Sequence, residues 1–212
     1  MPEYYYTNNP TSEHEERHFT GVFMGKTLGF ETDAGVFSKQ HIDPGSEILC
    51  KSLPELHGRV LDMGCGWGAM TVMTLARFPS LAVTMADVNE RALDLAVRNV
   101  RKNGMQAKAV LSDGFAHIEG EFDAVITNPP IRAGKAVIYQ MFADAKAHLA
   151  PGGRLFLVIR KQQGAESCMK YLKTLYAKVD KVEKSGGFWV LRATEPLKKE
   201  NEAQEEAADA HV

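Results

Sequence analysis

The sequence predicts an α/β protein with a mainly parallel, doubly wound sheet that is covered by helices on both faces. Short apolar runs alternate with helical segments from about residue 58 onward, as in successive βαβ units. The runs are nearly continuous in apolar residues, which is typical of strands that are buried on both faces. Several runs end in an acidic residue or a glycine loop, where an open α/β sheet binds its ligands.

The composition suits a globular domain. The chain has 212 residues, of which 44% are hydrophobic and 25% charged, so it can form a substantial core. A net charge of -2 does not by itself indicate a nucleic-acid partner, but binding depends on where charges cluster. The three cysteines form no CxxC pair, which favours a reducing compartment and argues against a disulfide framework.

We expect a cytoplasmic protein without a membrane segment or a metal site. No apolar run approaches the roughly 20 residues that span a bilayer. The first ten residues, MPEYYYTNNP, lack the basic start and apolar stretch of a signal peptide. The seven histidines show no paired ligand spacing, so we predict no metal ligands.

Residues 1–57 are predicted to form an arm, a hairpin and a helix that pack on the core formed by the residues that follow. The segment 21–38 alternates apolar and polar residues around glycines, which predicts one or two short hairpins. The run Asp43-Pro-Gly45 marks a turn or a helix start, and leucines follow it at helical spacing.

Residues 58–197 are predicted to form the core, and 198–212 a disordered acidic tail. The predicted strands are 59–63, 81–86, 107–111, 122–127, 154–160, 179–182 and 188–193, and the predicted helices are 69–77, 90–102, 135–149 and 164–176. Asn89 is a plausible N-cap, and Pro151-Gly-Gly153 is expected to stop the third of these helices. The last two strands are close together in sequence, so one should run antiparallel to its neighbours.

A glycine loop, Asp62-Met-Gly-Cys-Gly-Trp-Gly68, lies between the first core strand and its helix. Glycines at such a turn let the backbone approach a ligand closely. Ala69 completes a GxGxxA pattern, which makes a dinucleotide enzyme one alternative and a purely geometric glycine turn another.

Three aspartates near successive strand ends favour an adenosyl cofactor without phosphates. Asp62 would repel a pyrophosphate and attract a positively charged amino acid group. Asp87 is placed to accept from ribose hydroxyls, and Asp113 from an adenine amino group. Each aspartate alone is equally well explained as a helix cap or turn residue.

The segment Asn128-Pro-Pro-Ile131 follows the fourth core strand and should lie beside that cofactor. Proline fixes φ and lacks an N–H, so the loop is stiff and its carbonyls project outward. The Asn128 amide oxygen and the Pro129 carbonyl could together accept both hydrogens of a planar NH2 group. The alternative is a rigid connector without a catalytic role.

These residues resemble the class I S-adenosyl-L-methionine (SAM)-dependent methyltransferases, and most closely the ribosomal RNA small subunit methyltransferase C family, which methylates guanine N2. The resemblance runs from residue 5 to about 193. The motifs are Tyr5-Tyr6, Gly35-Val-Phe-Ser38 with Asp43-Pro-Gly45, the glycine loop, Asn128-Pro-Pro-Ile131 with Gly134-Lys135, and Leu149-Ala-Pro-Gly-Gly153.

The resemblance implies a Rossmann-like sheet in which a seventh strand is inserted antiparallel beside the fifth. It implies cofactor contacts from Asp62, Gly64, Cys65, Gly66, Asp87, Val88, Asp113 and Gly114, with Phe37 and Ser38 bordering the pocket. Asn128, Pro129, Pro130 and Ile131 would form the catalytic loop. Ile131 stands where the family usually has an aromatic residue that stacks on the base, and the chain corresponds to a single-domain form.

Ribosomal RNA or the small ribosomal subunit is therefore the expected partner. Arg132 and Lys135 after the catalytic loop, and Arg160 and Lys161 after the fifth strand, could bind phosphates. Each is alternatively an ordinary solvated charge. Other acceptors with a planar NH2 stay open, namely a protein glutamine or adenine N6. A nicotinamide dehydrogenase is disfavoured by Asp62, and a catalytically silent RNA-binding protein is a further alternative. The sequence does not indicate the oligomeric state.

Overall fold

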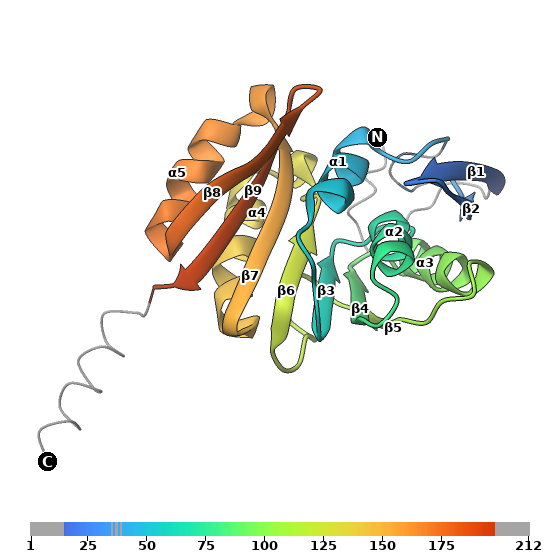
Figure 1. Ribbon diagram of the computed structural model, residues 1–212, viewed down its shortest axis with the longest axis horizontal. Coiled ribbons are helices and arrows are strands. Elements are labelled where there is room, and N and C mark those ends of the chain that lie inside the picture. The colour runs from blue at the N-terminus through green and yellow to red at the C-terminus, as the bar shows by residue number, and fades with distance from the viewer. Residues whose placement is uncertain (1–14, 35, 37, 39, 198–212) are drawn as a thin grey trace, which may run out of the picture.

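A computed structural model describes residues 15–34, 36, 38 and 40–197 (Figure 1). Its main element is a seven-stranded sheet with the order β5-β4-β3-β6-β7-β9-β8. The strands of this sheet are β3 (Arg59–Met63), β4 (Ala82–Asp87), β5 (Lys108–Leu111), β6 (Phe122–Thr127), β7 (Leu149–Arg160), β8 (Tyr176–Ser185) and β9 (Phe188–Pro196). All pairs are parallel except the two that involve β9, which is antiparallel to β7 and to β8. The predicted Rossmann-like sheet with one antiparallel strand is confirmed.

Helices cover both faces of the sheet and produce two separate apolar clusters. The α-helices are α1 (Pro44–Ser52), α2 (Ala69–Arg77), α3 (Glu90–Lys102), α4 (Lys135–Ala145) and α5 (Ala165–Leu175). One cluster contains the buried residues of α1, α2 and α3, and the other contains those of α4 and α5. Side chains alternate along a strand, so neighbours such as Phe156 and Leu157 of β7 belong to different clusters.

Several elements have the predicted bounds. Strands β3 and β6 and helices α2 and α3 begin and end where the apolar pattern places them. The Asn89 side chain accepts a hydrogen bond from the Ala92 N–H at 3.1 Å, so the predicted N-cap of α3 is confirmed.

The predicted helix over 135–149 is wrong at its C-terminal end. Helix α4 ends at Ala145, a 3-10 turn spans Lys146–His148, and β7 already begins at Leu149. The Pro151-Gly-Gly153 run lies inside β7, where the register against β6 shifts between Phe122 and Ala124. A Cβ at Gly153 would lie 2.9 Å from the Phe122 carbonyl oxygen, so the glycine permits this irregular pairing.

The predicted hairpin begins earlier than the pattern indicated. Strands β1 (Arg17–Phe23) and β2 (Lys26–Thr32) pair antiparallel through a turn at Met24 and Gly25. Three buried hairpin residues belong to the same apolar cluster as α2 and α3: Phe23, Leu28 and Phe30. The hairpin therefore covers the outer side of these helices, while the predicted division at residue 57 stays a prediction.

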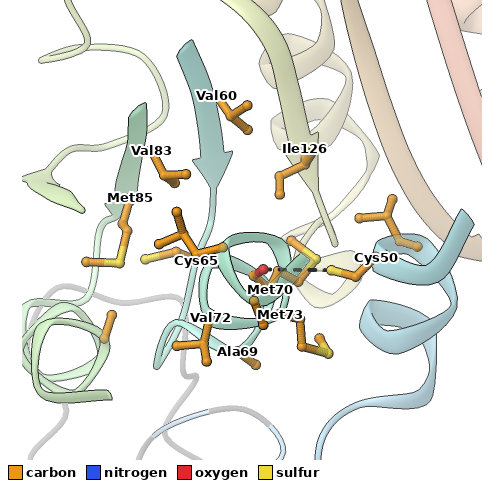
Figure 2. Close-up of a cluster of buried hydrophobic side chains, with 14 of the residues drawn as sticks. Cys50, Val60, Cys65, Ala69, Met70, Val72, Met73, Val83, Met85 and Ile126 are labelled. Carbon is orange, nitrogen blue, oxygen red and sulfur yellow. Dashed lines mark hydrogen bonds between the residues drawn. The ribbon is translucent and has the colours of Figure 1, made fainter. Parts of the chain in front are cut away.

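The core beneath the glycine loop fixes the position of that loop (Figure 2). Side chains of α2, such as Met70 and Val72, belong to the same cluster as Val60 of β3 and Met85 of β4. Gly68 starts α2 with φ at 84°, and a Cβ there would lie 2.9 Å from the Ala96 Cα. Only glycine allows this close approach of the α2 start to α3 without strain.

Some expectations concern residues outside the described part of the chain. They are the Tyr5-Tyr6 motif of the N-terminal arm, Phe37 at the border of the pocket and the acidic tail 198–212. Among the described residues, no helix is long and apolar enough to cross a membrane. The same residues contain no group of three or more potential metal-binding side chains.

Candidate functional site

A cavity of about 650 Å³ opens at the carboxyl ends of β3, β4 and β6, a size that suits a small-molecule ligand. Loops that follow these strands supply much of its wall. Among the predicted site residues, those that line the cavity are Ser38, Gly64, Cys65, Gly66, Asp87, Val88, Asp113, Gly114, Asn128, Pro129 and Pro130. Chain segments far apart in sequence thus meet where the sequence analysis placed the ligand.

The glycine loop presents open backbone to the cavity. Gly64 and Gly66 have φ values of 70° and 54°, and a Cβ on either would meet no atom within 4 Å. The Gly64 and Cys65 N–H groups both donate to the Ala86 carbonyl at 2.8 and 2.9 Å, which ties the loop to β4. The loop therefore leaves room for a ligand to lie directly against its backbone.

Cys65 is buried within this loop and lies beside the sheet and α2 (Figure 2). Burial raises the pKa of its thiol well above the ordinary value, and the nearby carboxylates of Asp87 and Asp62 act in the same direction. A protonated thiol is a poor nucleophile, so Cys65 is an apolar wall residue here.

Asp87 closes β4 and holds the next residue of the glycine loop. Its two carboxylate oxygens accept from the Gly66 N–H at 2.8 Å and from the Asn89 N–H at 2.9 Å. Burial raises the pKa of Asp87, and these backbone hydrogen bonds oppose the shift. A carboxylate oxygen has more than one lone pair, so Asp87 can still accept from a ligand hydroxyl.

Asp62 lies deeper than the sequence analysis expected. The residue is 0% exposed and does not line the cavity. Its Oδ2 accepts from the Thr71 hydroxyl at 2.6 Å, whereas Oδ1 has no hydrogen-bond partner among the described residues. Burial raises the pKa of Asp62 to about 7. A buried, half-satisfied carboxylate directly before the glycine loop is suited to pair with a cationic group of a ligand.

The Asn-Pro-Pro loop forms another part of the cavity wall. The Asn128 side-chain nitrogen donates to Asp43 Oδ2 and to Ser46 Oγ, both at 2.9 Å. The Pro130 carbonyl accepts from the Ala133 N–H at 2.8 Å. No loop N–H within the described residues donates to the Pro129 carbonyl.

Of the predicted residues Ile131 and Ser38, both of which the structure describes, only Ser38 is found in the cavity wall. Ile131 does not line the cavity; it is partly buried against the cluster formed by α4 and α5. Ser38 lines the cavity with φ at 54°, and its hydroxyl donates to the His41 carbonyl at 2.7 Å. Phe37 lies outside the described residues.

The four predicted RNA-binding residues are exposed and do not line the cavity. Arg132 and Lys135 lie on either side of Ala133, which is a cavity residue. Arg160 ends β7 and its guanidinium carbon lies 4.6 Å from the centre of the Phe188 ring. Since β6 and β7 are parallel neighbours, both pairs of basic residues lie at the edge of the sheet where the cavity opens.

Sequence reasoning did not assign Asp43 and Ser46 to the site. Both line the cavity at the start of α1 and contact Asn128. The available signal was the Asp43-Pro-Gly45 run, which indicates a turn or helix start and belongs to the family motifs, but which by itself assigns no role in the site. The outer wall formed by α4 was also missed, and it includes Ala136, Val137, Gln140, Met141 and Asp144.

The cavity fits a nucleoside cofactor that lacks phosphates. Its polar groups include the carboxylates of Asp87 and Asp113, and the buried Asp62, whose Oδ1 has no partner among the described residues, comes two residues before Gly64 of the glycine loop. These negative charges disfavour a pyrophosphate and favour a cation. The fold and the site together define a class I methyltransferase, whose cofactor is S-adenosyl-L-methionine.

Comparison with known proteins agrees with this class. The family model described as Methyltransferase small domain matches residues 27–192, which is most of the chain. The chain therefore belongs to the methyltransferase small domain family. Protein YbxB of Bacillus subtilis is 37% identical over 198 residues, which covers 91% of this chain and 98% of that protein.

Other relatives are named as ribosomal RNA methyltransferases. Ribosomal RNA small subunit methyltransferase C of Hahella chejuensis is 41% identical over 140 residues, or 64% of this chain and 41% of that protein. The T. thermophilus 16S rRNA N2 methyltransferase RsmC, solved in complex with AdoMet and guanosine, superposes with a TM-score of 0.76. That match has 28% identity and covers 88% of this chain and 52% of that one. The chain thus spans about half the length of these methyltransferase C relatives.

Proposed function

We propose that this protein transfers a methyl group from S-adenosyl-L-methionine to the N2 amino group of a guanine in 16S ribosomal RNA. The observation that supports the proposal is that Asn128 and Pro129 line the cavity and that the Asn128 side-chain nitrogen is already bonded to Asp43, which leaves the amide oxygen for an acceptor amine. The matches to methyltransferase C proteins, whose members include a 16S rRNA N2 enzyme, support the choice of acceptor.

The proposed site residues divide into two groups. Asp62, Gly64, Cys65, Gly66, Asp87, Val88, Asp113 and Gly114 would hold the cofactor, with Ser38 and Phe37 at the border of the pocket. Asp62 would pair with the cofactor's ammonium group, and Asp87 would accept from its ribose. The bound cofactor supplies an electrophilic methyl group on a sulfonium.

The acceptor amine would be held by Asn128 Oδ1 and the Pro129 carbonyl. Two accepted hydrogen bonds fix both N–H bonds of a planar NH2 group and so direct its lone pair out of the ring plane. The nitrogen would become positive as the new N–C bond forms and the methyl–sulfur bond breaks, with its electron pair left on a neutral thioether. Both oxygens would stabilise the charge on the nitrogen. Water then takes one proton from the nitrogen, since neither oxygen is basic enough to keep it.

The target base must leave its stack to reach this edge. Arg132, Lys135, Arg160 and Lys161 would hold the flanking phosphates. Ile131 packs on the core and leaves the proposed base contact to cavity residues such as Pro130. We further propose that residues 58–197 form the catalytic core and that residues 1–57 pack on it and complete the cavity wall.

The test is methylation of small ribosomal subunits from a strain that lacks the corresponding gene, with isotopically labelled cofactor and nucleoside mass spectrometry. We expect label in N2-methylguanosine alone. Label in N6-methyladenosine or in methylglutamine of a subunit protein would mean that the acceptor is an adenine or a glutamine side chain. The proposed methyl transfer to an NH2 group would then still hold. Cofactor binding without transfer to any subunit component would overturn the proposal, and an Asn128→Ala protein serves as the control without transfer.

A further inference from the structure

The side-chain amide of Asn128 is held by the first turn of a helix that is distant in sequence. One amide hydrogen is directed to Asp43 Oδ2 and the other to Ser46 Oγ, each across 2.9 Å. An amide NH2 has two donors, so these two bonds use both of them. The oxygen of the same amide remains for a ligand.

The chemistry of Asp43 determines which way the amide points. An ionised carboxylate only accepts hydrogen bonds, so the nitrogen of Asn128, and not its oxygen, must face Asp43. Amide orientation in a structure is assigned from such networks, and here a charged acceptor assigns it. Asn128 Oδ1 is therefore turned away from α1.

Asp43 is itself fixed in place by the helix that it caps. Its Oδ2 also accepts from the Ser46 N–H at 2.8 Å, and Pro44 occupies the first helical turn. A Cβ on Gly45 would lie 2.8 Å from the Phe188 ring and 3.0 Å from Asp43 Oδ2. The absence of a side chain at Gly45 thus lets the start of α1 pack directly against β9, which makes it a rigid support.

The charge on Asp43 also affects the amide electronically. An N–H that donates to a carboxylate polarises its amide group and increases the electron density on the oxygen. A more negative Oδ1 accepts more strongly from an amine, and its effect is greatest when the nitrogen becomes positive. This stabilisation would appear in the chemical step more than in cofactor binding.

We propose that Asp43 and Ser46 are positioning residues that orient Asn128 Oδ1 toward the acceptor amine. The inference rests on the proposed function, because it assigns them a role in that methyl transfer. The inference also states that Asp43 and Ser46 fix the Asn128 amide in the protein without substrate, and this can be measured separately from methyl transfer.

The structural part is tested by NMR exchange of side-chain amide hydrogens in the free full-length protein, with the Asn128 signals assigned by their loss in Asn128→Ala. We expect these hydrogens to exchange more slowly than those of Gln162, an exposed residue in the 3-10 turn that follows β7. Asp43→Ser and Ser46→Ala should each accelerate the exchange. Wild-type exchange as fast as that of Gln162 would overturn the proposal.

The kinetic part uses Asp43→Ser, since serine is also a good N-cap but is too short to keep the bond to Asn128. We expect kcat to fall roughly 10-fold or more, with binding of S-adenosylhomocysteine and KM for the subunit within about 2-fold of wild type. The melting temperature reports whether the cap is retained. Lys51→Ala on the same helix, which breaks only the Glu47–Lys51 ion pair, should leave kcat unchanged.

A double-mutant cycle then separates positioning from general damage to α1. If Asp43 acts through Asn128, adding Asp43→Ser to Asn128→Ala should change the residual rate by less than about 2-fold. Multiplicative effects of the two substitutions would overturn the proposal. If the wild-type protein transfers no methyl group to subunits, the proposed function fails, and the assigned catalytic role of Asp43 and Ser46 fails with it. If the Asn128 amide hydrogens nevertheless exchange slowly, the only conclusion left is that Asp43 and Ser46 hold the amide in place.

Discussion

The glycine loop and the Asn-Pro-Pro loop line the same cavity but are held in different ways. The glycine loop is held locally: Gly66 and Asp87, which bond at 2.8 Å, are 21 residues apart and belong to consecutive strand ends. The Asn-Pro-Pro loop depends on Asp43, which is 85 residues from Asn128. The first site is shaped by backbone, whereas the second depends on the orientation of one side-chain amide.

Because of this difference, the glycine loop and the Asn-Pro-Pro loop should tolerate different substitutions. A backbone site of glycines is disturbed by any added side chain, because its function is the space beside the chain. A site that depends on a side chain keeps its shape when one atom of that side chain is exchanged, but it loses the hydrogen bond that the atom made. Cofactor binding and catalytic rate should therefore respond to different substitutions.

The largest effect is expected for Asn128→Ala. Loss of an acceptor that faces developing charge typically costs roughly 10²- to 10³-fold in kcat. Calorimetry with S-adenosylhomocysteine should give an affinity within about 2-fold of wild type, since the contact proposed for Asn128 is with the acceptor amine and not with the cofactor. A rate close to that of the wild type would contradict the role given to the Asn-Pro-Pro loop.

The opposite pattern is expected for Gly66→Ala. The new methyl group would point into the cavity and would force alanine to keep φ at 54°. We expect cofactor affinity to fall roughly 10- to 100-fold, which is the range for an added methyl group in a filled site.

The matched control for this change is Gly104→Ala. Gly104 also has positive φ, at 70°, and open space at its Cβ, but it lies outside the cavity. It should show a similar loss of stability and unchanged affinity. Equal losses of affinity in both variants would mean that strain, and not the occupied cavity, explains the result.

A pH dependence is expected from Asp62, whose pKa burial raises to about 7 from 3.8. Pairing with the ligand's ammonium group requires the ionised form, so affinity for S-adenosylhomocysteine should rise by up to about 10-fold between pH 6 and 8. Binding should release protons, which calorimetry in buffers of different ionisation enthalpy detects. Asp62→Asn should bind more weakly at pH 8 and lose most of this dependence.

Asp62 should also make the stability of the ligand-free protein depend on pH, but in the opposite direction to cofactor affinity. The folded protein holds a proton on Asp62 between pH 4 and 7 that the unfolded chain has released. The free energy of unfolding of the ligand-free protein should therefore decrease as pH rises through this window. Denaturant titrations of wild type and Asp62→Asn isolate this contribution, and parallel pH profiles would contradict it.

The smallest effect is expected for the surface charges. Changing Arg160 and Lys161 together to glutamine should weaken RNA binding a few-fold and lower the slope of log affinity against log salt by about 1 to 2. The control is Lys108→Gln, an exposed residue at the opposite end of the strands. An equal loss in the control would mean that no specific patch exists.

The sequence predicted the local features of the fold and missed those that depend on distant partners. The bounds of β3 and β6 followed from short, nearly continuous apolar runs, because these strands are buried on both faces. Those of α3 followed from its helical periodicity, and α2 is the buried helical stretch directly after the glycine loop. The Pro151-Gly-Gly153 run was interpreted as a helix stop because those residues break helices in isolation. In the protein, pairing with β6 places them at a bulge inside β7.

The glycine-loop half of the cavity was determined largely by the sequence, because a strand, a glycine turn and a helix in succession fix their own geometry. Only the tertiary structure decided the arrangement around the Asn-Pro-Pro loop and the burial of Asp62. It buried Asp62 to the point that its pKa rises, and it placed Ile131 on the core instead of the cavity wall. It also brought Asp43 and Ser46 to Asn128, and which way a side-chain amide points depends on partners that only the folded chain brings together.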